Sequence, residues 1–534
     1  MPRWADLGHT LLSRSKGWLL ANLLARDSLL VLLAGVLAAL GLPPWGLPLV
    51  ALAALVLLLF LLHDVAVKRA VWLGFLFGIA HFSFAFQWLH NSLHAHGGAP
   101  YLLASLGVGG LAAVVALYTA LVAGLLSWSR LSPLLLPPAF ASLWVSVEWL
   151  RGTLFSGFPW TPLGLIWSDL ESLMQVADLG GVALLSGLTA LLAGALRLLL
   201  DPKLSQRLRI GWLVVVAGLF TAAHLYGQMR LAEPLESSAE RPPYRIALVQ
   251  GYVPQLEKWD KGWHDAHFKR YLDLTLGAGG QAAGEAVDLV VWPETAMAFF
   301  LQAFPERRQE LATLLATINT PLLAGVPTAA KQQEGGWHYA NSMLMLDRQG
   351  GWQQIYRKHH LVPFGEYMPM RWLLPDSLEK LTIGDKDFTP GEPSMGMAWH
   401  RGLIGPLVCY EVIFPELVRQ LANRGMQLLV NVTNDGWFGA AARPQHLQMS
   451  RMRAIENRLP LVRVANTGIS ASFDAWGREL GRLPEDAPAM AIHLVPQAPQ
   501  GGSLYRQIGG WLPLVWGGAA LLLVAWGRWR FQRV

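Results

Sequence analysis

The chain is poor in cysteine and in charged side chains. Of its 534 residues only Cys409 is a cysteine, so no disulfide can form within the chain and cysteine pairing says nothing about the compartment. Charged residues make up 15% of the sequence, against 53% hydrophobic residues. This balance lies outside the range of ordinary soluble domains, so membrane spans are the first feature to look for.

Apolar runs long enough to cross a bilayer, roughly 17 to 25 residues, recur through the first 230 residues and once near the end. We expect about eight spans, at residues 28–42, 46–63, 71–90, 101–127, 134–150, 175–196, 210–228 and 509–527. The apolar segment 18–25 either extends the first span or lies at the membrane interface. The sequence thus predicts a membrane domain over 1–230 and a C-terminal transmembrane helix over 509–527.

Basic residues gather in alternate loops between these spans. Lys68, Arg130 and Arg207 fall on the predicted side of the N-terminus, whereas loops 42–46 and 91–100 contain no Lys or Arg. Cytoplasmic loops retain basic residues, so the region after the seventh span is placed outside the inner membrane, in the periplasm. The net charge of +6 then reflects topology, and nucleic acid is not an expected partner.

Between residues 244 and 500 the pattern changes to short β-rich runs separated by helical stretches. Such runs occur at 244–250, 287–294, 321–327 and 426–435. Strands alternating with helices are typical of an α/β domain. The sequence therefore predicts a separate domain over 244–500, between the seventh span and the last one.

Three polar residues stand at or after strand-like runs of this domain: Glu294, Lys358 and Cys409. Strand ends are where α/β sheets usually place reactive groups. A thiol with a pKa of about 8.5 needs a base or a cation to react at neutral pH. A buried Glu can take its proton, and a Lys can stabilise the thiolate and an oxyanion. The three residues together could catalyse acyl transfer through a thioester.

The stretches around these residues, VVWPET, YRKHHLVPFGEY and VCYE, resemble in order and spacing the motifs of the nitrilase, or carbon-nitrogen hydrolase, superfamily. With spans on both sides, the chain is similar to the membrane-bound branch of that superfamily, the apolipoprotein N-acyltransferases of the Gram-negative inner membrane. The stretches 157–160, 249–260 and 434–439 add to this resemblance. It implies an α-β-β-α sandwich and a Glu-Lys-Cys triad.

The resemblance also implies a two-step reaction. Cys409, with Glu294 as its base, would attack the sn-1 ester of a phospholipid such as phosphatidylethanolamine and become acylated. The α-amine of the diacylglyceryl cysteine at an apolipoprotein N-terminus would then take the acyl chain from the thioester, while Lys358 holds the oxyanion. A thioester is an activated acyl donor, so the reaction implies no cofactor and no metal.

Five further residues match positions of the family. Glu366 matches a second glutamate that supports the triad, Tyr410 and Glu411 match the polar pair after the nucleophile, and Trp259 and Trp437 match tryptophans near the site. These five are predicted to support the triad, to hold the oxyanion or to bind substrate.

Two apolar stretches directly after motif residues, 297–304 and 368–375, are long for soluble loops. Our hypothesis is that both are membrane-facing lids that admit acyl chains. The segment 157–164 is expected to pack under the catalytic domain. Glu148 and Arg151, at the end of the fifth predicted span, are costly in a bilayer; a functional or pairing role and extension to the interface are equal alternatives for them.

Other functions remain open at this point. A membrane-tethered carbon-nitrogen hydrolase of the amidase or nitrilase type would use the same triad with water as acceptor. A transporter or scaffold whose outer domain only binds ligands would need broken helices with paired ionisable residues in mid-membrane, and apart from Glu148 and Arg151 the spans are nearly free of charge. Four histidines could suggest a zinc site: His264, His267, His359 and His360. No cysteine or carboxylate completes such a site at a familiar spacing.

Overall fold

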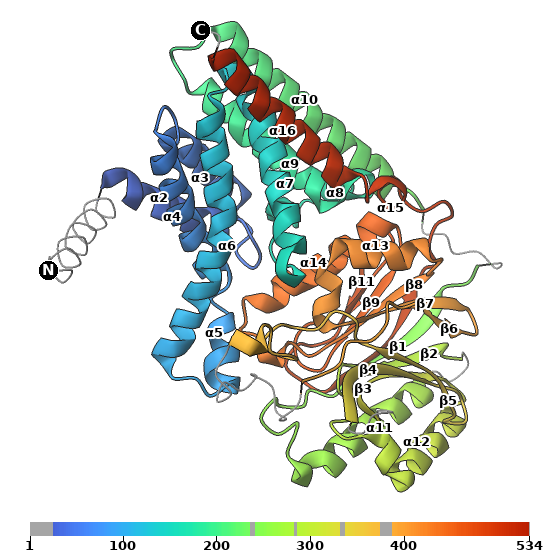
Figure 1. Ribbon diagram of the computed structural model, residues 1–534. Coiled ribbons are helices and arrows are strands. Elements are labelled where there is room, and N and C mark those ends of the chain that lie inside the picture. The colour runs from blue at the N-terminus through green and yellow to red at the C-terminus, as the bar shows by residue number, and fades with distance from the viewer. Residues whose placement is uncertain (1–24, 235–240, 282–285, 332–336, 374–386, 533–534) are drawn as a thin grey trace, which may run out of the picture.

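The chain has a helical part and an α/β part, as the computed structural model in Figure 1 shows. The structure describes residues 25–234, 241–281, 286–331, 337–373 and 387–532. The apolar segment 18–25 lies outside this set except for its last residue.

The helical part lies in the upper left of Figure 1 and contains both the early helices and the last one. Its longer described helices are α2 (Arg26–Ala39), α3 (Pro48–Leu61), α4 (Val67–Ala85), α6 (Tyr101–Ser129), α7 (Leu136–Thr153), α9 (Ala177–Leu199), α10 (Gln206–Leu231) and α16 (Leu512–Phe531). Short helices connect them: α5 (Leu89–Asn91), η1 (Ser92–His96), η2 (Pro133–Leu135), η3 (Leu154–Ser156), η4 (Leu163–Trp167), α8 (Glu171–Met174) and α15 (Leu504–Ile508).

The expected number of eight spans is not confirmed. In the described part of the chain, five helices are long and apolar enough to cross a membrane, and α4 followed by α5 and η1 makes a sixth only if a bend of 64° is counted within one span. Helices α2 and α3 have 14 described residues each. At 1.5 Å per residue that is about 21 Å, shorter than a hydrocarbon core of about 30 Å.

The α/β part consists of two six-stranded sheets. The first has the order β12-β1-β2-β3-β4-β5, with β1 (Tyr244–Gln250), β2 (Leu289–Trp292), β3 (Leu322–Lys331), β4 (Trp337–Leu346), β5 (Trp352–Arg357) and β12 (Ala489–Val495). The second has the order β11-β10-β9-β8-β7-β6, with β6 (Met397–Trp399), β7 (Gly402–Val408), β8 (Leu428–Thr433), β9 (Leu461–Ala465), β10 (Ala471–Phe473) and β11 (Glu479–Arg482).

In each sheet three central strands are parallel, β1-β2-β3 and β7-β8-β9, and the outer strands pair antiparallel. Parallel strands buried on both faces read as continuous apolar runs, which explains why these segments are conspicuous in the sequence. The carboxyl ends of β2 and β7 therefore come to one edge of the sandwich, where Glu294 and Cys409 follow them.

Helices cover both outer faces, and the predicted α-β-β-α sandwich is confirmed. One core lies between the sheets and includes Ile246, Val408 and Val430. A second lies between the first sheet and helices α11 (His264–Gln281) and α12 (Pro305–Ile318). The second sheet is covered by α13 (Pro415–Asn423) and α14 (Ala442–Asn457), which lie on the side of the helical part in Figure 1.

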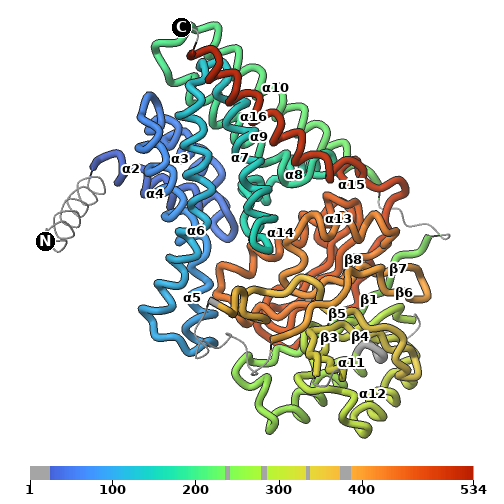
Figure 2. Tube along the Cα trace, viewed as in Figure 1, coloured from blue at the N-terminus to red at the C-terminus, as the bar shows by residue number. Residues whose placement is uncertain are grey.

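The core around α13 and α14 continues into the helical part. Buried residues of both parts, such as Phe86, Trp160, Tyr410 and Leu447, belong to the same hydrophobic cluster. Figure 2 shows the chain leaving the early helices for the sandwich and returning to them in α16, which packs on α6 and α7. The two parts thus share one packed interface rather than a linker alone.

Candidate active site

Cys409 stands on a sharp turn between β7 and the short helix η8 (Cys409–Ile413). Its backbone has φ of 52°, the left-handed region that a non-glycine residue adopts only under local constraint. The side chain is buried, with 5% of its surface exposed. A nucleophile on such a turn projects from the sheet edge with little freedom to move.

A buried polar network holds this turn from below. The carbonyl oxygen of Cys409 accepts a hydrogen bond from Asn431 Nδ2 at 3.3 Å and lies 3.3 Å from Nε2 of His446. His446 in turn lies 3.1 Å from Asp435 Oδ1, and Arg463 pairs with Asp435 Oδ2 at 2.6 Å. Four of these side chains are fully buried, so the network fixes the strained turn without access to solvent.

Glu294 follows β2 and faces the same edge. Its Oε1 accepts a hydrogen bond from Asn341 Nδ2 at 2.7 Å. Its Oε2 is buried and has no hydrogen-bond partner among the described residues. Gly325 on β3 permits this placement, because a Cβ there would lie 2.6 Å from the Glu294 Cα. One carboxylate oxygen is thus fixed, and the other is left without a bond.

Lys358 follows β5 and forms a buried ion pair with Glu366, at 2.9 Å between Nζ and Oε2. Asn341 donates to Glu366 Oε1 at 3.0 Å as well as to Glu294, and its own carbonyl oxygen accepts from the Lys358 amide at 2.8 Å. The structure therefore brings Glu294, Lys358 and Glu366 together around one asparagine.

Glu411 does not face this group. Its Oε1 accepts hydrogen bonds from the Tyr356 hydroxyl at 2.6 Å and from the amides of His359 and His360 at 2.8 and 3.0 Å. Its Oε2 accepts from the amide of Val408 at 2.7 Å. The carboxylate thus joins the segment after β5 to the turn at Cys409.

Tyr410 points away from the sheet toward the helical part. Its hydroxyl donates to the carbonyl oxygen of Gly157 at 3.2 Å. Three residues farther on, Trp160 donates from Nε1 to Gln445 of α14 at 2.8 Å, so the expectation that segment 157–164 packs under the catalytic domain is confirmed. Arg151 holds this segment by donating to the Trp160 carbonyl at 2.6 Å.

The two predicted tryptophans are half-buried. Trp437 is half-buried, and its carbonyl oxygen accepts a hydrogen bond from Ser92 Oγ at 2.6 Å, with the His96 ring 5.5 Å from its own. It therefore contacts the bent helix that follows α4. Trp259 is half-buried beside Lys258.

The hypothesis that 297–304 is a membrane-facing lid is wrong. Met297, Phe299 and Leu301 are buried in the core between the first sheet and helices α11 and α12. In the second stretch, Met370 and Trp372 are 58% and 82% exposed, as a lid would require. Residues 374 and 375 of that stretch lie outside the described chain.

The electrostatics of the site follow from its burial. Burial raises the pKa of the Cys409 thiol, the Glu294 carboxylate raises it further, and Lys358 lowers it. Burial also raises the pKa of Glu294, against the opposing charge of Lys358. Burial alone would lower the pKa of Lys358, but the carboxylate of Glu366 raises it. The thiol is thus protonated at rest and depends on a neighbouring base.

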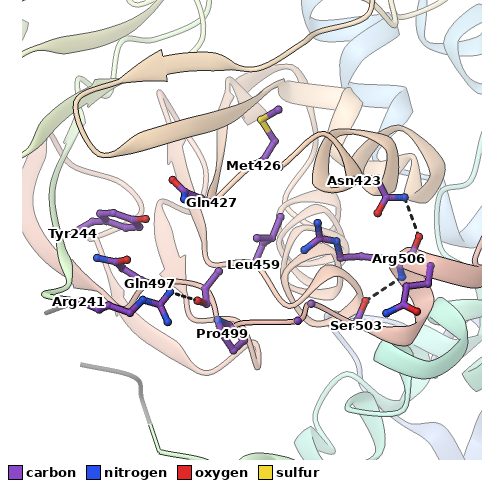
Figure 3. A pocket seen from close by; sticks show the side chains of 15 residues that line it. Arg241, Tyr244, Asn423, Met426, Gln427, Leu459, Gln497, Pro499, Ser503 and Arg506 are labelled. Atoms are coloured by element: carbon purple, nitrogen blue, oxygen red, sulfur yellow. Dashed lines mark hydrogen bonds between the residues drawn. The ribbon is translucent and has the colours of Figure 1, made fainter. Parts of the chain in front are cut away.

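A cavity of about 440 Å³ is found elsewhere in the α/β part (Figure 3). Its lining includes Arg241, Tyr244, Gln427 and Arg506, near the amino ends of β1 and β8. Cys409 follows the carboxyl end of the neighbouring strand β7, so this cavity lies at the opposite edge of the sandwich. It is not the site of the candidate triad.

Comparisons with known proteins agree with the motifs. The carbon-nitrogen hydrolase family model matches residues 245–498, and that of the apolipoprotein N-acyltransferase N-terminal domain matches 34–195. The apolipoprotein N-acyltransferase of Geobacter metallireducens is 36% identical, covering 91% of this chain and 92% of its own. That of Azotobacter vinelandii is also 36% identical, covering 94% and 95%. The chain belongs to the apolipoprotein N-acyltransferase family.

Among solved structures, the chain is similar to the C. elegans NitFhit protein, with 21% identity and a TM-score of 0.38 over 51% of this chain and 64% of that one. A mutant of the Nesterenkonia AN1 amidase from the nitrilase superfamily gives 21% identity and a TM-score of 0.36 over 49% and 93%. As a member of the apolipoprotein N-acyltransferase family, the protein is an acyltransferase with a carbon-nitrogen hydrolase domain.

Two residues of the site were not predicted. Asn341 lies in the middle of β4 and bridges two carboxylates, but a lone Asn in an apolar strand gives no local indication of this role. Lys258 lies within the stretch 249–260 that supported the resemblance, next to Trp259, and donates to the Glu294 carbonyl oxygen. Its place in a motif could have identified it.

Proposed function

We propose that this acyltransferase moves an acyl chain from the sn-1 position of a phospholipid such as phosphatidylethanolamine to an apolipoprotein. The acceptor is the α-amine of the N-terminal diacylglyceryl cysteine, and the intermediate is a thioester on Cys409. The observation that carries this mechanism is the buried Glu294 Oε2, which lacks a hydrogen-bond partner among the described residues and belongs to a carboxylate whose charge acts on the thiol.

In the first half-reaction Glu294 takes the thiol proton and Cys409 attacks the ester carbonyl. The tetrahedral oxyanion is stabilised by the Lys358 ammonium and by backbone N–H groups of the nucleophile turn. When the C–O bond breaks, Glu294 returns the proton to the departing alkoxide. The products are a lysophospholipid and the acyl-enzyme, and Glu294 is a carboxylate again.

In the second half-reaction the neutral amine attacks the thioester carbonyl. Glu294 accepts the proton that the nitrogen loses, and passes it to the Cys409 thiolate as the C–S bond breaks. Amide formation from a thioester is downhill and needs no further energy source. Water competes with the amine, so the buried position of Cys409, with 5% of its surface exposed, favours transfer over hydrolysis.

The remaining predicted residues act through this triad. Glu366 fixes Lys358 through their 2.9 Å ion pair, and Glu411 fixes the nucleophile turn. Tyr410 ties the turn to the helical part. Trp259 and Trp437 bind the lipid substrates.

We also propose the arrangement in the cell. Residues 1–230 form a membrane domain, 244–500 the catalytic domain, and 509–527 a final transmembrane helix. The distribution of basic loops supports a Gram-negative inner-membrane location with the catalytic domain in the periplasm. Both substrates are lipid-anchored there, which supports a site close to the bilayer surface.

The test is to incubate the purified protein with phospholipid alone and to analyse the peptide that contains Cys409 by mass spectrometry. We expect one added acyl group in the wild type and none in Cys409→Ala. Phosphatidylethanolamine with different chains at sn-1 and sn-2 identifies the donor position. No adduct on the wild type would overturn the mechanism.

A second step distinguishes transfer from hydrolysis. A diacylglyceryl lipopeptide with a free α-amine should remove the acyl group from Cys409 and appear as a triacylated product. Release of free fatty acid at the same rate with and without the lipopeptide would favour a membrane-tethered carbon-nitrogen hydrolase instead.

A further inference from the structure

A second lysine lies inside the candidate site. Lys258 is 3% exposed, in the turn after β1, and its Nζ donates to the carbonyl oxygen of Glu294 at 3.0 Å. Lysine is almost never this deeply buried without a reason, because removing the ammonium from water is costly. Its bonded partner is a main-chain carbonyl, which cannot neutralise the charge. The charge itself must therefore have another use.

Two carboxylates near Cys409, Glu294 and Glu411, form no ion pair among the described residues, and both oxygens of Glu411 are instead satisfied by hydrogen bonds. Lys358 is neutralised by Glu366 at 2.9 Å, and the Asp435 carboxylate beneath the turn is neutralised by Arg463 at 2.6 Å. This leaves Glu294. When it takes the thiol proton, the same negative charge moves to the sulfur of Cys409. The Lys258 ammonium lies 3.0 Å from the Glu294 carbonyl oxygen and pairs with no carboxylate among the described residues, whereas Lys358 is held by Glu366, so Lys258 is the cation left to act on this charge.

We propose that Lys258 is a positioning residue that holds the main chain of Glu294 and, as a cation, stabilises the negative charge that passes from Glu294 to Cys409. It transfers no proton and forms no bond with substrate. The inference rests on the proposed triad and adds a fourth charged group to it.

The protonation of Lys258 makes this role measurable. Burial lowers its pKa to about 8, while the charges of Glu294 and Cys409 act in the opposite direction. Below pH 8 the ammonium is present and favours the thiolate. Above pH 8 it loses its proton, and its effect on Cys409 disappears.

The single cysteine provides the assay. Because Cys409 is the only thiol in the sequence, alkylation by iodoacetamide reports on it alone. The rate is proportional to the thiolate fraction. We would measure it between pH 6 and 9.5 for the wild type, Lys258→Gln and Lys258→Arg, with exposed Lys261→Gln as the matched control. Gln keeps a donor for the Glu294 carbonyl and removes only the charge.

We expect Lys258→Gln to be alkylated about tenfold more slowly than the wild type below pH 8, which corresponds to a rise of about one unit in the pKa of the thiol. The difference should narrow above pH 8, where the wild type also loses the charge. Lys258→Arg should match the wild type below pH 8 and exceed it above, and Lys261→Gln should match it throughout.

Two results would overturn the proposal: equal rates for Lys258→Gln and the wild type at pH 7, or a ratio between them that does not change with pH. If Lys258→Gln does not fold, as judged by its thermal unfolding, the comparison of Lys258→Arg with the wild type above pH 8 decides the question. The alkylation assay uses no lipid, so it tests the role of Lys258 alone. The acyl-enzyme experiment with phospholipid tests the proposed reaction, and the two proposals can therefore fail independently.

Discussion

The sandwich has two helical layers: an outer layer, α11 and α12 on the first sheet, and an inner layer, α13 and α14 on the second sheet. The two layers differ in how much of their surface is buried. Helix α12, on the first sheet, has three buried residues out of 14. Helix α14, on the second sheet, has 13 buried out of 16, and many of these are polar or charged. In Figure 1 the first layer forms the far end of the molecule, whereas the second lies between its sheet and the membrane helices.

The inner layer is attached to the helical part by directional bonds. Arg458, at the end of α14, pairs with Asp178 of α9 at 2.6 Å, with both side chains buried. Glu456 accepts from the Val182 amide at 2.8 Å, and Gln445 donates to the Pro43 carbonyl at 3.0 Å. Buried polar contacts need good geometry to be favourable, so they select one docked arrangement.

The three residues of the candidate triad do not all lie on the same sheet. Glu294 and Lys358 belong to the first sheet, whose outer helices touch the helical part little, whereas Cys409 belongs to the second sheet and rests on α14 through His446. Cys409 is therefore supported by the layer that packs on the helical part, whereas Glu294 and Lys358 lie on the sheet whose outer helices make few contacts with that part. Mutations in the inner layer should disturb the position of Cys409 more than the positions of Glu294 and Lys358.

The largest expected effect comes from breaking the buried pair between the layers. Asp178→Ala leaves Arg458 buried without its partner, which should lower the free energy of unfolding by about 3–5 kcal/mol. The matched change in the outer layer is Asp265→Ala, which removes a pair with Arg307 in which Asp265 is 86% exposed. It should cost at most about 1 kcal/mol. Thermal unfolding followed by tryptophan fluorescence measures both, and equal losses would contradict the distinction between the layers.

Acid should weaken the inner layer next. Although burial opposes it, the charge of Arg463 and the contact with His446 hold the pKa of Asp435 well below its usual value. A depressed carboxyl pKa contributes stability above the ordinary value of about 3.9, and this stability is lost as pH falls below it. Between that value and the lower native pKa only the unfolded chain binds the proton, so about 1.4 kcal/mol of stability is lost for each pH unit.

The measurement is the unfolding midpoint of the wild type and of Asp435→Asn at pH 6 and at pH 3. The stability advantage of the wild type should be present at pH 6 and shrink at pH 3. If the difference between the two proteins is the same at both pH values, Asp435 is not the group responsible.

The smallest expected effect is at the contact between the nucleophile turn and segment 157–160. Tyr410→Phe keeps the ring and removes only the hydrogen bond to Gly157, so it should cost about 0.5–1.5 kcal/mol. Because this bond steadies the turn, acyl-enzyme formation should slow several-fold while the protein remains folded. Tyr101→Phe, at an exposed helix start, is the control and should change neither quantity.

Much of this arrangement could be predicted from the sequence, because the parallel strands are continuous apolar runs and the motif residues follow their ends. Hydropathy could not separate full spans from shorter helices such as α3, or reveal the bend after α4, since a window of apolar residues carries no information on helix breaks. Phe299 was misplaced for a related reason: an apolar stretch beside a motif looks the same whether it faces lipid or a core.

The unpredicted site residues show a different limit. Lys258 and Asn341 both form hydrogen bonds to Glu294, which lies 36 residues after Lys258 and 47 residues before Asn341. No periodicity connects such positions, and only the folded sheet brings them together. The geometry around Cys409 and the core shared by the two parts likewise depend on contacts between distant segments, which no local pattern in the sequence records.

The pair between Asp178 and Arg458 joins residues 280 positions apart, and this separation bears on the order of synthesis. Chains fold broadly from the N-terminus as they are made, so α9 exists before α14 and can serve as a template for it. Helices α15 and α16 are made last and close the interface from the other side. The turn at Cys409 would then reach its final shape only after α14 has packed against it and on α9, so a product truncated before α14 would carry Cys409 without that support.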